Sequence, residues 1–215
     1  MHLKTFVFNP YGVNTYILSD DEGNSIIVDP ACCSPEEQAA LTAFVCDGGL
    51  TVRWLVNTHG HFDHVIGNAF VCGSWHPKCA AHRDDLFLMN NVFRQGEIFG
   101  CSVEQPPAPD LLLKGGEEWT PCGLNIRILH IPGHSPGSIV LHLPDEGILF
   151  AGDVLFRESI GRSDLPGGNF DLLVDGIRQH LLTLPPDTVV WPGHGPATSI
   201  GHEKRYNPFL TGQEN

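Results

Sequence analysis

The chain has 215 residues, including 24 Gly and 17 Pro, and its 25 acidic and 12 basic residues give a formal net charge of −13. This length suits one domain, and so acidic a surface repels phosphate backbones, which argues against a nucleic-acid partner. No apolar run approaches the ~20 residues of a membrane span. The start of the chain is no secretory signal, and the seven Cys form no C-x-x-C pair, so we expect a soluble cytoplasmic protein without a membrane partner.

The first quarter of the chain reads as strands followed by a helix. Residues 3–8, 14–19 and 25–29 have the apolar and β-branched composition of strands, with turn residues between them. Asp29 ends the third strand, where we expect a turn-forming role more than a role behind a metal ligand. A helix over residues 35–46 follows, because Ser, Pro and two Glu at its start are typical of a helix N-terminus.

The next strand, residues 52–56, leads into Thr-His-Gly-His-Phe-Asp-His at residues 58–64. His59 and His61 lie two positions apart and project to the same side of an extended chain, so both can reach one ion. Residues 65–70 can start a helix with Asp63 at or near its N-cap, and Asp63 and His64 are better placed for a second ion. Imidazole and carboxylate ligands suit zinc, iron or manganese, and the lack of thiolates argues against a closed structural zinc site.

A strand over residues 78–81 precedes a long connection, residues 83–110. It has helical character near residues 84–93 and then a run of Gly and Pro. Because long irregular connections in compact proteins are often functional, this segment is a candidate lid over a substrate; a plain surface loop is the alternative.

The second half returns to strands at residues 125–131, 138–143, 147–150 and 188–191, with a helix over residues 170–182. His134 and His194 lie in Pro-Gly-His turns that follow strands, and Asp153 follows the strand that ends near residue 150. We expect residues 201–215 to form a polar tail over the surface. If the chain divides near residue 115 into two sheets packed face to face with helices outside, these turns share one rim.

The strand ends thus provide seven candidate metal ligands, enough for two ions, and Asp153 is the natural bridge because a carboxylate has two oxygens. We expect surface or core roles for the histidines outside these turns, at positions 2, 76, 82, 130, 142, 180 and 202. The candidate ligands are His59, His61, Asp63, His64, His134, Asp153 and His194.

This set, His-x-His-x-Asp-His followed by Pro-Gly-His, Gly-Asp and Gly-His, resembles the metallo-β-lactamase superfamily. Residues 152–156, 161–168, 192–196 and 207–210 resemble the short bacterial type II glyoxalase-like (hydroxyacylglutathione hydrolase-like) metallo-hydrolases in particular. The resemblance implies an α+β fold, a four-layer αβ/βα sandwich. It also implies two metal sites that share Asp153: one with His59, His61 and His134, the other with Asp63, His64 and His194.

Two divalent ions, zinc before iron or manganese, can hold a bridging water and bring its pKa from 15.7 to about 7. Asp63 is placed to orient the resulting hydroxide, so it is the candidate catalytic residue. A thiol of pKa about 8.5 leaves as thiolate without a proton donor. Hydrolysis of a small acyl thioester is therefore the reaction that needs the fewest catalytic groups in this site. The chain ends before the C-terminal glutathione-binding helical domain of the full-length enzymes, so we expect a single domain, residues 1–215, without strong glutathione specificity.

Differences from related families narrow the choice of reaction. Lactonases of the superfamily carry Tyr where this chain has Phe156, and the common zinc β-lactamases carry Cys where it has Asp153. The rival reading is a persulfide dioxygenase with one iron, an oxidoreductase that shares a Gly-Arg-x-Asp stretch like residues 161–164. In either case Arg162 is a candidate contact for a substrate carboxylate; bracing of its own turn is the alternative.

Overall fold

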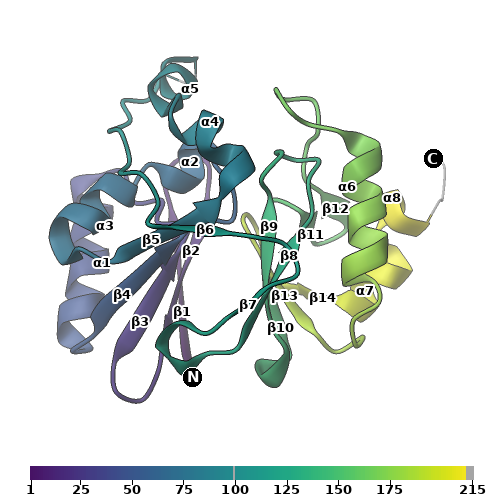
Figure 1. Ribbon diagram of the computed structural model, residues 1–215, viewed down its shortest axis with the longest axis horizontal. Coiled ribbons are helices and arrows are strands. Elements are labelled where there is room, and N and C mark those ends of the chain that lie inside the picture. The colour runs from purple at the N-terminus through teal and green to yellow at the C-terminus, as the bar shows by residue number, and fades with distance from the viewer. Residues whose placement is uncertain (99, 212–215) are drawn as a thin grey trace.

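A computed structural model describes residues 1–98 and 100–211. Two six-stranded sheets pack face to face, and helices cover the outer face of each sheet (Figure 1). The chain passes from the first sheet to the second between Leu113 and Glu118. The predicted four-layer αβ/βα sandwich and its division near residue 115 are therefore confirmed.

The first sheet has the strand order β1-β2-β3-β4-β5-β6. Strands β1 to β3 are antiparallel, whereas β3 to β6 run parallel, so the carboxyl ends of β3, β4 and β5 meet at one rim. That rim receives the turns that follow these three strands. The strands are β1 (His2–Phe8), β2 (Val13–Ser19), β3 (Asn24–Val28), β4 (Thr51–Val56), β5 (Lys78–His82) and β6 (Leu111–Leu113).

The second sheet has the order β14-β13-β10-β9-β8-β7. Strands β10 and β13 are parallel neighbours, so the segments after them emerge at the same rim, as does the turn from β8 to β9. A two-stranded ribbon of β11 (Leu155–Phe156) and β12 (Ser159–Ile160) follows β10. The strands of the sheet are β7 (Glu118–Trp119), β8 (Ile126–His130), β9 (Ile139–Leu143), β10 (Ile148–Gly152), β13 (Val189–Pro192) and β14 (Thr198–Ser199).

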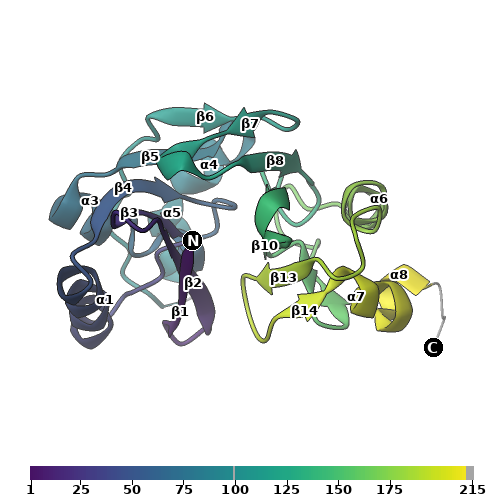
Figure 2. The same ribbon diagram turned by 90° about the horizontal axis from the view of Figure 1, so that it is seen from below.

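The helices form the two outer layers (Figure 2). Helices α1 (Pro35–Asp47) and α3 (Asn68–Trp75) cover the first sheet, and Ser34 starts α1 with a capping box. Helix α6 (Phe170–Gly176) continues as a π-helix, Ile177–Leu181, and covers the second sheet with α7 (Ile200–Tyr206) and α8 (Pro208–Thr211). An apolar core lies between the two sheets, and a further core lies under each helical layer.

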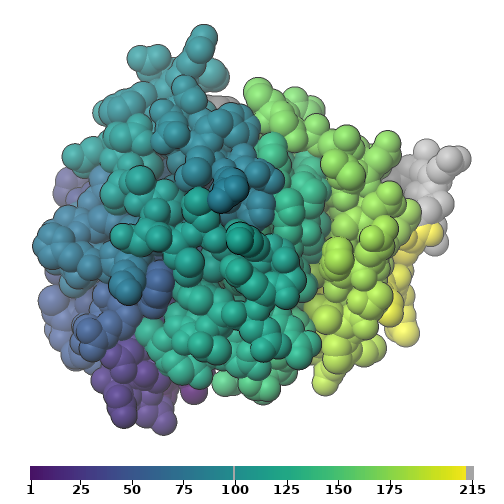
Figure 3. Space-filling view, viewed as in Figure 1, coloured from purple at the N-terminus to yellow at the C-terminus, as the bar shows by residue number. Residues whose placement is uncertain are grey.

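Shorter elements stand on the rim that carries the candidate ligands. They are α2 (Phe62–Val65), the 3₁₀ turn Arg83–Asp85, α4 (Leu86–Met89) and α5 (Val92–Ile98). Figure 3 shows the segment of α4 and α5 projecting at the top, beside the light-green chain that leads into α6. A fourth apolar cluster, which includes Phe62, Met89 and Val103, fixes this segment to the body of the protein.

The structure corrects three local predictions. Two helices form where the sequence suggested that one starts: α3 begins at Asn68, within residues 65–70, but the separate turn α2 precedes it, and Asp63 lies in the first turn of α2 after the N-cap residue His61. Helical structure extends to Ile98 in the candidate lid, past Gly96, which is buried. The expected polar tail forms α7 and α8 instead, because Glu203 and Leu210 are buried against the second sheet's layer; residues 212–215 lie outside the described part. In residues 1–98 and 100–211 no helix is long and apolar enough to cross a bilayer.

Candidate metal centre

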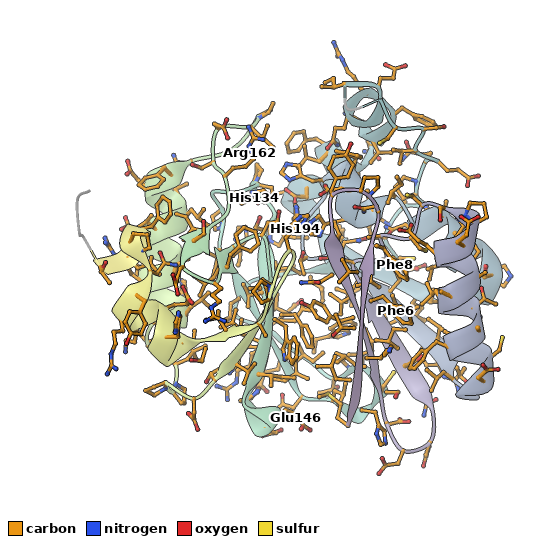
Figure 4. The ribbon with its side chains drawn as sticks, turned by 180° about the vertical axis from the view of Figure 1, so that it is seen from behind. Phe6, Phe8, His134, Glu146, Arg162 and His194 are labelled. Atoms are coloured by element: carbon orange, nitrogen blue, oxygen red, sulfur yellow. The ribbon has the colours of Figure 1, made fainter. Side chains whose placement is uncertain are left out.

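The structure brings all seven candidate ligands together on the rim where the two sheets meet. In Figure 4, His134 and His194 lie close to each other at the upper end of the sheets, and Glu146 marks the opposite end. The first sheet supplies the residues after β4, and the second supplies those after β8, β10 and β13. Strand ends distant in the sequence thus form one cluster.

Three imidazoles form the first group. His134 Nε2 lies 2.8 Å from His61 Nδ1 and 3.2 Å from His59 Nε2, and all three side chains are buried. Three nitrogens this close to each other cannot all be satisfied by hydrogen bonds among themselves, whereas nitrogens about 2.0–2.1 Å from one shared zinc ion would have this arrangement. The group therefore has the geometry of a metal site.

The second group contains two imidazoles and a carboxylate. His64 Nε2 lies 3.2 Å from His194 Nε2, and Asp63 Oδ2 lies 3.5 Å from His194 Nε2. Asp153 lies between the groups: its Oδ1 is 3.3 Å from His64 Nε2 and its Oδ2 is 3.6 Å from His134 Nε2. One carboxylate thus reaches both groups.

The second ring nitrogen of four histidines has an oxygen partner of its own. Nδ1 of His134 donates to the carbonyl of Arg162 at 2.8 Å, and Nδ1 of His194 donates to the carbonyl of Tyr11 at 3.0 Å. Since Nδ1 carries the proton, Nε2 presents its lone pair to the cluster, as a metal ligand requires. The other two partners are Thr58 Oγ1 for His59 and Asp29 Oδ2 for His64.

Asp29 does more than form a turn, which corrects the sequence-based preference. Its buried carboxylate accepts hydrogen bonds from the Thr58 amide at 2.8 Å, the Thr58 hydroxyl at 2.6 Å and His64 Nδ1 at 3.0 Å. Asp29 adopts a left-handed backbone conformation with φ 47°, which Asp tolerates better than most residues. The end of β3 therefore holds the ligand turn after β4.

Sequence reasoning missed Asp85, which belongs to the segment read as a lid. Its buried carboxylate accepts hydrogen bonds from the Gly60 amide at 2.8 Å, the Ser135 hydroxyl at 2.6 Å and the Gly137 amide at 2.6 Å. It thereby joins the turn that carries His59 and His61 to the turn that carries His134. An acidic pair following a strand that ends on the ligand rim was the available signal.

The electrostatics of the cluster favour bound cations. Burial, reinforced by His134, lowers the pKa of His61 to about 3, so this ring is neutral. Burial also opposes a charge on His194, but hydrogen bonds to Asp153 and Asp63 outweigh it and raise its pKa to about 9. In the absence of metal, the carboxylates thus keep part of the cluster protonated. A divalent ion would displace these protons.

Two further features test whether the residues fit metal ions. Asp153 Oδ1 is buried and accepts no hydrogen bond in the described structure, which is costly for a carboxylate oxygen unless a cation binds it. A Cβ on Gly193 would collide with that oxygen and would lie 2.8 Å from His64 Cε1, so the Pro-Gly-His turn needs glycine here. The donor set and the space around it fit two cations.

A cavity of about 270 Å³ opens beside the cluster. Tyr11, Phe62 and Leu165 give it an apolar wall, and Gln95 from the candidate lid lines it as well. Arg162 is the one lysine or arginine among the lining residues that the structure describes, and its guanidinium forms two 2.8 Å hydrogen bonds to Asp164. Its backbone carbonyl, not its side chain, contacts His134.

The other histidines stay outside this cluster. His82 and His130 stack with their ring centroids 4.0 Å apart, near Asp84. One ligand atom of each ring and one of Asp84 lie within 4.8 Å of one another, but Nε2 of His130 is already 2.8 Å from the Pro136 carbonyl, so this smaller group is separate from the rim cluster.

The superfamily model for the metallo-β-lactamases matches residues 8–194 of the chain. The chain belongs to the metallo-β-lactamase superfamily. The superfamily binds divalent metals, and the His and Asp groups on the rim of this chain could hold such ions. The predicted resemblance is confirmed.

Three similar proteins match nearly the whole length of the chain. The hydroxyacylglutathione hydrolase GloC of Haemophilus influenzae is 35% identical over 216 residues, 98% of each chain. The crystal structure of the B3 metallo-β-lactamase BLEG-1 has a TM-score of 0.90 and 33% identity, covering 98% of this chain and 100% of that one. The structure of TTHA1623 in a di-iron-bound form has a TM-score of 0.87 and 36% identity, covering 96% and 100%.

Proposed function

We propose that the rim cluster binds two divalent metal ions and that the protein is a metal-dependent thioesterase of the glyoxalase II type. One ion would take His59, His61 and His134, the other Asp63, His64 and His194, with Asp153 shared. The observation that carries the proposal is the position of Asp153, whose carboxylate reaches nitrogens of both groups beside an open cavity.

Zinc is the first candidate, and iron is the second because a similar chain is known in a di-iron form. When bound, the two ions supply a hydroxide nucleophile at neutral pH and an electrophile for the substrate carbonyl. The chain's own residues orient the reaction: Asp63 faces the cavity and can accept a proton, and Asp29 and Asp85 hold the ligand turns.

The cavity lining favours a thioester. Its apolar wall suits a small acyl group, and a leaving thiol with pKa about 8.5 departs as thiolate without a proton donor. A phenol, Tyr11, does line the cavity, but its hydroxyl lies 3.4 Å from Cys101 Sγ, and this contact raises the pKa of Tyr11 to about 12. The GloC name of a full-length relative points to the same reaction class.

One preparation, loaded separately with zinc and with ferrous iron, tests the proposal. We expect about two ions per chain and rates that fall in the order thioesters, activated oxygen esters, lactones and β-lactams. A β-lactam cleaved faster than any thioester would contradict the proposed order. Oxygen uptake with glutathione persulfide, combined with one iron per chain and no thioester cleavage, would establish the dioxygenase instead.

A further inference from the structure

Two thiols face each other away from the metal cluster. Cys72 lies on α3 and Cys79 on β5, and their Sγ atoms are 3.1 Å apart. A disulfide has an S–S length of about 2.05 Å, so the sulfurs need to approach by only about 1 Å. Both cysteines are reduced in the structure.

The fold itself holds the two cysteines in this position. The Cys79 amide donates to Asp110 Oδ2 at 2.7 Å, and the Asp110 amide donates to the Cys79 carbonyl at 2.8 Å. Between the cysteines the chain reverses at His76, which has a left-handed φ of 51°, and at Pro77. The sulfur contact therefore follows from a helix end and a strand start with fixed backbones.

We propose that Cys72 and Cys79 are an oxidation site, a dithiol that small disulfides such as glutathione disulfide convert reversibly into an intramolecular disulfide. Cys72 is half-buried and can be reached by the oxidant, whereas Cys79 is 6% exposed and acts from inside. This site is independent of the proposed hydrolase activity.

The reaction proceeds by two thiol–disulfide exchanges. The Cys72 thiolate attacks one sulfur of the small disulfide, forming a mixed disulfide and releasing one small thiolate. The Cys79 thiolate then attacks Cys72 Sγ, forming the Cys72–Cys79 bond and releasing the second small thiolate. The protons of the two protein thiols end on the two released thiols, so the protein loses two electrons and the oxidant gains them.

The electrostatics of the pair give this order. The hydrogen bond from Cys79 lowers the pKa of Cys72, which makes Cys72 the better initial nucleophile. The same hydrogen bond with Cys72 is the largest cause that raises the pKa of Cys79, and burial is the second. Once Cys72 is in a mixed disulfide it carries no charge, so this largest cause disappears; burial still raises the pKa of Cys79, but Cys79 ionises more readily than before and can resolve the intermediate.

The bond would form close to the ligand turn without touching a ligand. Asn57, two residues before His59, donates its backbone amide to the Ala80 carbonyl, and its side chain pairs with Asn68 at the start of α3. The disulfide would thus tie together two elements that already flank the metal turn. We expect the oxidised protein to keep its metal and to melt about 5–10 °C higher, because an eight-residue loop is closed.

Peptide mapping of the metal-loaded full chain tests the site. The protein is equilibrated in glutathione disulfide and glutathione, free thiols are blocked with N-ethylmaleimide, and the denatured protein is digested with trypsin without reduction. Lys78 separates the two cysteines, so the expected product is peptide 54–78 linked to peptide 79–83, lost on treatment with dithiothreitol.

Two variants complete the experiment. Cys46→Ser removes an exposed cysteine of α1 and should leave the linked peptides unchanged. Cys79→Ser should stop the reaction at glutathionylated Cys72, which shows that Cys72 reacts first. The proposed site is wrong if the peptide map of the oxidised wild-type protein shows Cys72 alkylated by N-ethylmaleimide, still bound to glutathione, or linked to a cysteine other than Cys79.

Discussion

At the residue scale, Asp153 is the side chain on which the two nitrogen groups depend. Asp153→Ala removes the only oxygens that reach both His64 and His134 in the described cluster. We therefore expect metal content to fall from two ions to one or none, and kcat/KM for a thioester to fall more than about a hundredfold, beyond the usual effect of residues behind the ligands.

The matched control is His180→Ala. His180 lies in the π-helical turn after α6, away from the rim, so metal content and activity should both be retained. Elemental analysis after gel filtration measures the first quantity. Two tightly held ions in Asp153→Ala would show that this carboxylate is no bridge.

Tyr11 tests whether the leaving group needs an acid. Tyr11→Phe deletes only the hydroxyl, because the contact of Tyr11 with His194 comes from the backbone carbonyl and the ring contact with Phe62 is kept. For a thioester we expect kcat/KM to change less than about threefold. A loss of about a hundredfold or more, the size typical of a general acid, would mean that Tyr11 donates a proton.

At the scale of elements, the turn after β5 organises the two turns that carry the first ligand group. Asn at position 85 could not accept all three hydrogen bonds, since its amide nitrogen would face a donor from Gly60, Ser135 or Gly137. Asp85→Asn should therefore weaken metal binding about 10–100-fold.

Asp84→Asn, at the exposed neighbouring position, is the matched control and should keep wild-type affinity. Competition with a chromogenic chelator measures both variants, and circular dichroism checks that they are folded. Wild-type metal affinity in folded Asp85→Asn would show that these hydrogen bonds do not position the ligands.

At the scale of the whole molecule, the net charge of −13 acts on charged substrates. The acidic protein repels an anionic thioester such as S-lactoylglutathione, and Arg162 is already paired with Asp164. We expect a KM well above the low micromolar range that falls as salt screens the repulsion, whereas a neutral thioester should show little salt dependence.

If Arg162 contacts the carboxylates of that substrate, Asp164→Asn should lower KM and Arg162→Ala should raise it, each up to about fivefold, as for an exposed ion pair. Initial rates at several ionic strengths measure these effects. A KM for the anionic substrate that rises with added salt would contradict the argument from charge.

Metal removal should affect the stability of both sheets together, because the ligands come from both. A chelator leaves Asp153 Oδ1 buried without a hydrogen bond and leaves imidazole nitrogens facing each other at 2.8–3.2 Å. Since the proposed ions would bind the folded state, their removal should lower the melting temperature and abolish thioester hydrolysis, and zinc should restore both. An unchanged melting temperature after complete metal removal would mean that the ions do not link the sheets.

The sequence alone predicted the seven candidate ligands and the two-sheet arrangement. Each candidate ligand follows an apolar strand within a few residues, and such short-range patterns are legible in one chain. Strands distant in sequence then bring these turns together, because parallel neighbours such as β10 and β13 end at the same rim.

Only the tertiary structure decided what stands behind the ligands. Asp29 contacts Thr58 across 29 positions, Asp85 contacts Ser135 across 50, and the carbonyl of Tyr11 meets His194 across 183. Asp29 ends a strand and Asp85 begins a helical turn, so local pattern gives either of them an ordinary turn or cap role. Their function depends on the packing of distant segments, which no local spacing encodes.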